Sequence, residues 1–195
     1  MFYHSFLIKY AEIGTKGKNR YIFEDALMHD IRHKLDKIDG EFAIQKEQGR
    51  IYVNAKTEYE YDDVIDALSR VFGITGICPM MQIEKCGYDE LREKVLAFVK
   101  EEHPEQSFSF KVHARRADKH YPVNSDIINA DVGYDILCAY PEARVDVHHP
   151  DFIVYIEVRQ KINVYTRVLP GAGGMPMGTN GKAMLLLSGG IDSPV

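Results

Sequence analysis

Hydrophobic residues in the first part of the chain follow two regular spacings. Alternating runs over 2–10, 42–44 and 51–53 predict strands, because successive side chains of a strand point to opposite faces. Apolar residues that recur at helical spacing over 19–38 and 64–72 predict two amphipathic helices, each with one buried face. The order of strand, helix, hairpin and helix indicates a small α+β layer and not a doubly wound sheet.

A second set of elements begins after Gly76. Helical spacing predicts one helix over 88–102 and another that runs to about Ala139, with Asn124 or Ser125 as its N-cap. Alternating runs predict further strands at 80–84, 108–112, 145–147, 152–158 and 162–164. The stretch PGAGGMPMGTNG that follows is so rich in Gly and Pro that we expect neither a helix nor a strand ladder there.

These elements predict a protein of the α+β / α/β class in four segments. We expect a ferredoxin-like domain at 1–57, a domain with a mixed sheet at 58–168 and a Gly/Pro-rich linker at 169–182. At 183–195 we expect the first strand of an α/β nucleotide-binding domain that is cut short. Two interpretations of the linker stay open: a flexible connector, or a segment that packs on the nucleotide-binding domain.

Composition narrows the function classes. With 195 residues the chain is long enough for two buried cores, and no run of about 20 apolar residues indicates a membrane span. The three cysteines are widely spaced, which disfavours a disulfide framework and a zinc site and favours a cytoplasmic protein. Since the net charge is −5, any contact with nucleic acid has to come from local basic clusters.

Two such clusters lie beside predicted strands. Their basic residues could line one groove that holds a phosphate backbone, through contacts that are sensitive to salt and independent of sequence. Tyr121, beside the second cluster, could stack on an unpaired base. The alternative is that the clusters form a solvated face and that Tyr121 is a packing residue. The candidate residues are Lys9, Lys16, Lys18 and Arg20 in the first cluster, and Lys111, Arg115, Arg116 and Lys119 in the second.

The last residues form a candidate phosphate site. A short apolar strand, Met184 to Leu187, runs into the small-residue loop SGGIDS. The backbone N–H groups of Gly189 and Gly190 could turn toward an anion, with hydroxyl donors from Ser188 and Ser193. Asp192 is the candidate catalytic residue, as a ligand of Mg²⁺. The alternative is an ordinary turn after a strand. No Walker A lysine follows, and no histidine spacing resembles a set of metal ligands.

Three segments in this order resemble one family. They are KYAEIGTKGKNR near the start, FKVHARRADKHYPVNSDIINADVG with the strands after it, and GAGGMPMGTNGKAMLLLSGGIDSPV at the end. Together they resemble the amino-terminal half of the tRNA 4-thiouridine synthetases, also called thiamine-biosynthesis sulfurtransferases. The first segment resembles their ferredoxin-like domain, the second a THUMP domain that binds RNA, and the SGGIDS loop resembles their pyrophosphatase loop.

The resemblance implies an ATP-dependent tRNA uracil 4-sulfurtransferase, which this chain alone would not complete. ATP would adenylate O4 of a uridine, and a persulfide sulfur would then displace AMP. The family implies ATP and Mg²⁺ as cofactors, with tRNA, a cysteine desulfurase and a sulfur-carrier protein as partners. Sulfur transfer for the thiazole of thiamine is a further implied role. The residues implied in ATP binding are Leu186, Leu187, Ser188, Gly189, Gly190, Asp192 and Ser193.

Two other functions stay open at this point. The chain could belong to an adenylating enzyme that acts on a small molecule, or it could be a stand-alone RNA-binding module. We nominate no cysteine as a sulfur carrier, and we expect Cys138 to be buried in its helix. The oligomeric state is open, and a homodimer is one option.

Overall fold

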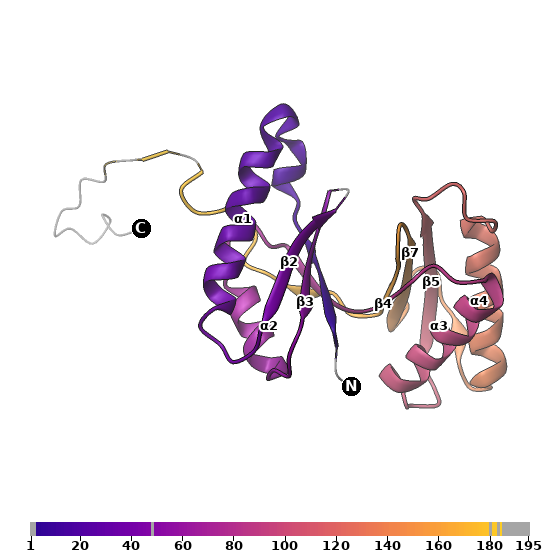
Figure 1. The fold of residues 1–195 in the computed structure, drawn as a ribbon. Helices are drawn as coiled ribbons and strands as arrows, with labels where there is room; N and C mark the ends of the chain where they lie inside the picture. Colours follow the sequence, from indigo (N-terminus) through magenta and orange to yellow (C-terminus); the bar gives the residue numbers. More distant parts are fainter. Residues whose placement is uncertain (1–2, 48, 180, 183, 185–195) are drawn as a thin grey trace.

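The computed structural model describes residues 3–47, 49–179, 181, 182 and 184. The described residues form one continuous sheet of nine strands, in the order β2-β3-β1-β4-β8-β7-β5-β6, with β9 paired to β4. One half of this sheet belongs to an N-terminal domain and the other half to a second domain (Figure 1). The predicted α+β class with a mixed sheet is confirmed.

The N-terminal domain has the strand order of a ferredoxin-like fold. Its strands pair antiparallel in the order β2-β3-β1-β4, and its helices follow β1 and β3, as the sequence predicts. Its elements are β1 (Ser5–Lys9), η1 (Glu12–Thr15), η2 (Gly17–Asn19), α1 (Arg20–Leu35), β2 (Phe42–Glu47), β3 (Arg50–Ala55), α2 (Tyr61–Ser69) and the first part of β4 (Gly76–Ile83).

The second domain carries the mixed half of the sheet. Strand β5 pairs parallel with β6 and β7, whereas β7 pairs antiparallel with β8. The Asn124 side chain caps α4 by accepting hydrogen bonds from the backbone N–H groups of Asp126 and Ile127, as its sequence position predicts. The elements are α3 (Tyr88–Glu102), β5 (Ser109–Arg116), α4 (Ser125–Ala139), β6 (Arg144–Val145), β7 (Phe152–Val158), β8 (Ile162–Tyr165) and β9 (Leu169–Pro170).

Strand β4 belongs to both domains. Its residues Gly76 to Met80 pair with β1, and its residues Met81 to Ile83 pair with β8. The strand begins earlier than the predicted range of 80–84. Polar contacts also join the domains: the Tyr3 hydroxyl donates to the Glu102 carboxylate, and the Asn163 amide donates to the Tyr52 hydroxyl. The two halves of the sheet are therefore tied by backbone and by side chains.

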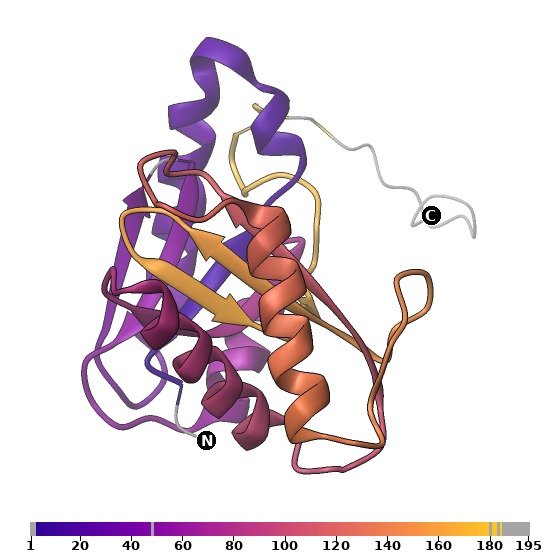
Figure 2. The same ribbon diagram turned by 90° about the vertical axis from the view of Figure 1, so that its right-hand side faces the viewer.

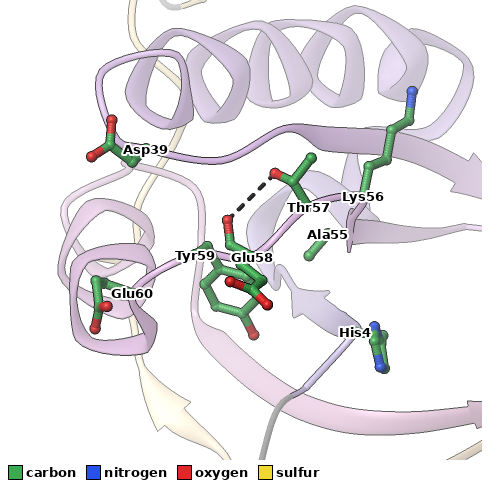
Figure 3. A pocket seen from close by; sticks show the side chains of 8 residues that line it. All are labelled: His4, Asp39, Ala55, Lys56, Thr57, Glu58, Tyr59 and Glu60. Carbon is green, nitrogen blue, oxygen red and sulfur yellow. Dashed lines mark hydrogen bonds between the residues drawn. The ribbon is translucent and has the colours of Figure 1, made fainter.

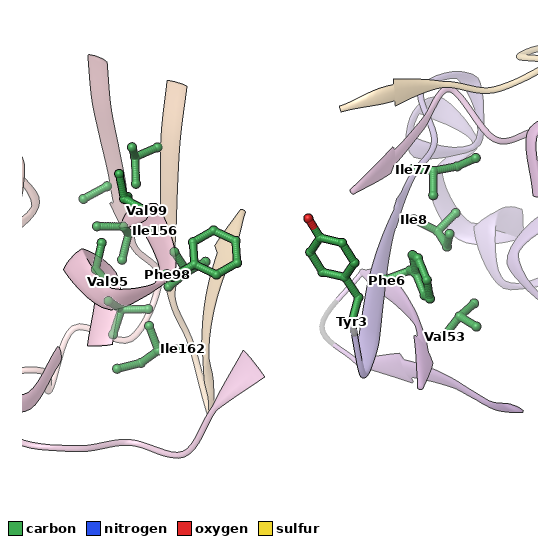
Figure 4. Close-up of a cluster of buried hydrophobic side chains, with 14 of the residues drawn as sticks. Tyr3, Phe6, Ile8, Val53, Ile77, Val95, Phe98, Val99, Ile156 and Ile162 are labelled. Carbon is green, nitrogen blue, oxygen red and sulfur yellow. The ribbon is translucent and has the colours of Figure 1, made fainter. Parts of the chain in front are cut away.

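Each half of the sheet has helices on one face only. Helices α1 and α2 lie on the outer side of the N-terminal half, and α3 and α4 lie on the outer side of the second half (Figures 1 and 2). Buried side chains fill these helix-covered faces, among them Phe6 and Ile8 in one domain and Val95, Val99 and Ile156 in the other (Figure 4). Each buried aliphatic or aromatic side chain contributes about 1.5–3 kcal/mol. The two uncovered faces look toward each other.

A smaller apolar cluster lies on the uncovered side. It consists of Leu7, Tyr52, Cys78, Met80 and Tyr165, with Tyr155 packed against it. Leu7 belongs to this cluster because it alternates in β1 with Phe6 and Ile8, which face the helices. The alternation in β1 thus builds the main core and the domain junction from neighbouring residues.

The segment after the second domain returns to the N-terminal domain. Strand β9 pairs with β4 through Ile77↔Leu169 and Gly76↔Pro170, so the expectation that no ladder forms here is wrong at its first residues. The backbone of Gly173 then bonds to Gly73 and Ile74. This described part of the linker packs on the ferredoxin-like domain, which neither of the two open interpretations included.

Two smaller expectations also need correction. Cys138 is exposed and not buried, because α4 is apolar on several sides and turns Ile128, Val132 and Ile136 inward. The strand predicted at 145–147 is reduced to Arg144–Val145, with both residues exposed. No helix among the described residues is long and apolar enough to cross a membrane.

Candidate nucleic-acid interface

A positively charged hollow lies between the uncovered faces of the two domains. It has a volume of about 170 Å³ and is lined by Lys9, Arg50, His113, Arg115, Tyr155, Glu157 and Tyr165. We call this set the basic hollow. His113 and Arg115 are exposed because they alternate along β5 with Val112 and Ala114, which face inward. The structure therefore brings Lys9 from the first predicted cluster and Arg115 from the second to one place.

Lys9 is held at the mouth of the hollow by two aromatic rings. Its Nζ lies 4.9 Å from the ring centre of Tyr155 and 5.0 Å from that of Tyr165. The two rings stack on each other, with centres 4.8 Å apart. A cation over an aromatic face is attracted by the ring electrons without being neutralised by an opposite charge. Lys9 thus keeps its charge for an anionic ligand.

A buried carboxylate organises the floor of the hollow. Glu157 accepts hydrogen bonds from Arg50 Nη2 at 3.0 Å, from Arg159 Nε at 3.0 Å and from the Tyr165 hydroxyl at 3.2 Å. Burial alone would raise the pKa of Glu157, but the charges of Arg50 and Arg159 and these hydrogen bonds lower it overall. The carboxylate stays ionised and fixes both guanidinium groups.

Arg50 has donor capacity left over. Its Nη2 bonds to Glu157, whereas its buried Nε has no hydrogen-bond partner among the described residues. With Lys9, Arg115 and Arg159 nearby, cations outnumber the single carboxylate of the hollow. Such an excess of fixed positive charge in a concave site attracts phosphate groups.

The first predicted cluster divides into two kinds of residue. Lys16 and Lys18 are exposed, and Lys16 Nζ lies 5.0 Å from the ring centre of Phe23. Arg20 is bound internally, because its Nε donates to Glu24 at 2.7 Å and its Nη2 donates to the Tyr10 hydroxyl at 2.7 Å. Arg20 therefore fixes the start of α1 and is less available to a ligand than the two lysines.

The second cluster divides in the same way. Arg115 and Lys119 are exposed. Arg116 holds the loop after β5, since its Nη1 donates to the Tyr121 carbonyl oxygen at 2.9 Å, and Lys111 Nζ donates to the Val147 carbonyl oxygen at 3.3 Å. Arg115 and Lys119 are the members that solvent and ligands reach most easily.

Tyr121 lies in the core and not on the surface. It is 6% exposed, and its hydroxyl has no hydrogen-bond partner among the described residues. Burial raises the pKa of this hydroxyl. A ring in this position cannot stack on a base without leaving the core, so the burial favours the alternative of a packing residue.

The two basic segments lie on the same side of the molecule. Segment η1–η2 stands at the top of the N-terminal domain, and the loop between β5 and α4 stands at the top of the second domain (Figures 1 and 2). Both views agree on this placement. A single nucleic acid could therefore contact both segments and the basic hollow, although the role of each residue stays a prediction.

A larger hollow at the other end of the N-terminal domain has the opposite charge. Its volume is about 840 Å³, and its lining includes Lys56 but also Asp39, Glu58 and Glu60 (Figure 3). The Thr57 hydroxyl donates to the Glu58 carbonyl oxygen across 3.4 Å. Carboxylates repel a phosphate backbone, so volume alone does not mark the interface.

Sequence reasoning assigned no role to four residues of the basic hollow: Arg50, Tyr155, Glu157 and Tyr165. Arg50 was taken as part of a hairpin turn, although it begins β3. Tyr155 lies in the strand predicted at 152–158, but no role was assigned to it. The only available signal was the alternation of polar and aromatic residues with buried ones, and this does not say what the exposed face meets.

The residues predicted to bind ATP and Mg²⁺ lie outside the described residues. This applies to Leu186, Leu187, Ser188, Gly189, Gly190, Asp192 and Ser193. Within the described ranges, no group of three or more His, Cys, Asp or Glu could hold a metal ion. Burial raises the pKa of Cys78 to about 11, so its thiol stays protonated and is a poor sulfur carrier.

Comparison with known proteins agrees with this architecture. Residues 5–78 match the model of the ThiI ferredoxin-like domain, and residues 87–167 match that of the THUMP domain. Among the curated relatives, a probable tRNA sulfurtransferase of Agathobacter rectalis is 56% identical over 193 residues, which are 99% of this chain and 49% of the relative. The chain thus spans about half the length of the curated relatives it matches.

Solved structures give the same result. A crystal structure of a 4-thiouridine synthetase–RNA complex with bound ATP matches with a TM-score of 0.78 and 35% identity, over 99% of this chain and 48% of that one. A structure from Pyrococcus horikoshii matches with a TM-score of 0.79 and 32% identity, over 94% of this chain and 60% of that one. The fold and sequence define a ferredoxin-like domain joined to a THUMP domain. The chain corresponds to the amino-terminal half of the tRNA 4-thiouridine synthetase family of sulfurtransferases.

Proposed function

We propose that this chain is the tRNA-binding part of an ATP-dependent tRNA uracil 4-sulfurtransferase. The observation that carries the proposal is the basic hollow, where Lys9, Arg50 and Arg115 from two domains converge on one open face. The similarity to a synthetase solved with RNA supports it, because that match covers 99% of this chain.

The binding would depend mainly on the phosphate backbone. Lys9, Arg50 and Arg115 present fixed cations, and the exposed Lys16, Lys18 and Lys119 extend the positive surface above the hollow. Contacts of this kind recognise the position and shape of phosphates, and base identity contributes little to them. The acidic total charge of −5 then limits non-specific binding outside this face.

The sulfur chemistry would follow in the remaining part of the protein. A carbonyl oxygen is a poor leaving group, so O4 of the uridine would first attack the α-phosphorus of ATP and expel pyrophosphate. The terminal sulfur of a persulfide would then attack C4 and expel AMP, which leaves the uridine joined to the donor through an S–S bond. Attack of a second thiol on the donor's sulfur would break this bond, release 4-thiouridine and leave a disulfide on the donor. Ser188, Gly189, Gly190 and Ser193 would hold the phosphates, with Asp192 as a Mg²⁺ ligand.

Several partners and roles belong to the same proposal. A cysteine desulfurase, with or without a sulfur-carrier protein, would supply the persulfide, because burial keeps the Cys78 thiol protonated and we nominate no other cysteine of this chain as a sulfur carrier. Sulfur transfer for the thiazole of thiamine, a homodimeric assembly and a cytoplasmic location complete the proposal.

The direct test is a salt titration of tRNA binding to this chain. Raising salt from about 50 to about 200 mM should weaken binding steeply, with a linear dependence of log K on log salt concentration. Absence of binding at low salt, or binding that does not respond to salt, would contradict the proposal. In the full-length protein, pyrophosphate release that requires both ATP and tRNA would exclude a small-molecule adenylating enzyme and a stand-alone RNA-binding module.

A further inference from the structure

The segment at residues 169–179, which we call the strap, is bound closely to the ferredoxin-like domain. It begins as β9, antiparallel to the first residues of β4. The N–H of Gly173 then donates to the Ile74 carbonyl oxygen at 2.7 Å, and the N–H of Gly73 donates to the Gly173 carbonyl oxygen at 2.7 Å. A reciprocal pair of short backbone hydrogen bonds is a feature of ordered structure and not of a loose connector.

Side chains and a close approach strengthen this contact. A Cβ added to Gly171 would lie 2.3 Å from the Ile74 carbonyl oxygen, so only glycine allows the strap to lie so near the backbone of Ile74, just before β4. Met175 packs against the main core, and Pro176 is buried beside Gly73. The N–H of Met177 finally donates to an Asp30 carboxylate oxygen of α1 at 3.3 Å.

The strap determines where the chain leaves the RNA-binding domains. After the THUMP domain the backbone does not continue from that domain. It crosses back along β4 and reaches the helix side of the ferredoxin-like domain at α1 (Figure 1). The uncovered face with the basic hollow lies on the other side of the same sheet. The exit point is therefore fixed relative to the hollow through one four-stranded sheet.

We propose that the strap is a positioning element, which holds the part of the protein that follows it at a set distance and orientation from the bound tRNA. This inference rests on the proposed function, because it assigns the strap's effect to sulfur transfer at a particular uridine. Misplacement of reacting groups by about 1 Å can slow a reaction by about a hundredfold, so a fixed exit point has a direct consequence for turnover.

The chain offers a matched pair of variants for the test. Gly171→Val puts a branched side chain against the Ile74 carbonyl oxygen. Ala172→Val introduces the same side chain at the next position, which is exposed. Neither residue belongs to the basic hollow. Gly171→Val should release the strap, and Ala172→Val should leave it bound.

The position of the strap can be measured without an assay of enzyme activity. Spin labels on the exposed Cys138 and on a Met177→Cys variant, with Cys86→Ser and the buried Cys78 retained, report the distance from the THUMP domain to the strap, because Met177 is an exposed residue of the strap. The distance distribution should be narrow in the parent chain and with Ala172→Val, and broad with Gly171→Val. In parallel, exchange of the Gly173 amide should be slower than in an unstructured peptide by on the order of a hundredfold, and Gly171→Val should remove this protection. A broad distribution or an unprotected amide in the parent chain overturns the inference.

The consequence for turnover needs the full-length protein. Gly171→Val should lower kcat for 4-thiouridine formation by about tenfold or more while KM for tRNA stays unchanged, and Ala172→Val should have no effect. An unchanged kcat with a released strap overturns the positioning role. If the unaltered full-length protein forms no 4-thiouridine, the proposed function fails, and the positioning role for sulfur transfer fails with it, whatever the spin labels show.

Discussion

The basic residues on strands and those on loops differ in how firmly they are held. Lys9, Arg50 and Arg115 are carried by β1, β3 and β5 and lie around one hollow, where aromatic rings and a buried carboxylate fix two of them. Lys16, Lys18 and Lys119 lie in connecting segments and are exposed. The difference suggests that the strand residues define where a phosphate binds, whereas the loop residues add long-range attraction.

The largest expected effect comes from reversing charge in the hollow. The double variant Lys9→Glu, Arg115→Glu should weaken tRNA binding at low salt by about a hundredfold and make the log K against log salt slope shallower by about 2. Both residues line the hollow, so the negative charges would face the phosphates at close range. Filter binding or fluorescence anisotropy across a salt series measures both quantities.

A control with equal charge change lies on the helix layers. Arg70→Glu, Lys100→Glu alters two exposed residues at the ends of α2 and α3, away from the uncovered faces. It should change tRNA affinity only a few-fold. An equally large loss in both double variants would mean that net charge, and not the hollow, controls binding.

A second, smaller effect concerns the buried carboxylate that fixes Arg50. Glu157→Gln removes the charge that pairs with Arg50 and Arg159 and should lower the free energy of unfolding at pH 7 by about 2–3 kcal/mol. Because the pKa of Glu157 is lowered in the folded protein, its contribution is present above the ordinary value of 4.5 and is lost as pH falls below it.

The measurement is urea unfolding of both proteins between pH 7 and pH 3. The gap in stability between parent and Glu157→Gln should narrow below pH 4.5, since the parent alone loses a favourable charge there. Glu93→Gln, at an exposed position of α3, is the matched control and should be neutral. A gap that is constant with pH would show that the charge of Glu157 does not stabilise the fold.

The third prediction separates two residues of one basic cluster. Arg20→Ala should cost about 1–2 kcal/mol of unfolding free energy, because it removes hydrogen bonds to Glu24 and the Tyr10 hydroxyl. Lys18→Ala should leave stability within about 0.5 kcal/mol and make the salt slope of tRNA binding shallower by about 1. Thermal unfolding and the salt titration, applied to both variants, give the comparison. Equal destabilisation by both would remove the distinction between bound and exposed cations.

The fold was predictable to the extent that local signals determine it. The ends of α3 and α4 agree with the sequence because a cap or a clear loss of apolar spacing marks them, as Asn124 shows. The start of β4 was missed because its first six residues, GICPMM, are a continuous apolar run with a proline inside and show no alternation. Pro79 is tolerated because β1 pairs with it on one side and the strand changes its other partner near this point.

The candidate site was less predictable, for a physical reason. Alternation shows that His113 and Arg115 leave the core, but only the docking of two sheet faces places them beside Lys9 and Arg50. Such docking depends on the apolar cluster that contains both Leu7 and Tyr165, two residues far apart in the chain. The linker illustrates the same limit, since its glycines indicate an irregular segment and also permit the close contact of Gly171 with Ile74.

The smallest expected effect on tRNA binding concerns Tyr121. Tyr121→Leu keeps an apolar side chain in the core, so stability should fall by only about 1 kcal/mol, and tRNA affinity should stay within about twofold. If Tyr121 left the core to stack on a base, the loss of its ring would weaken binding by about 1–3 kcal/mol. Tyr21→Leu is a useful companion variant, because Tyr21 is 58% exposed beside the basic η1–η2 segment. Binding measured at one low salt concentration for Tyr121→Leu, with unfolding as a check of the fold, decides whether the loop beside Arg115 contributes charge alone or charge together with an aromatic contact. The same measurement for Tyr21→Leu decides this for the η1–η2 segment.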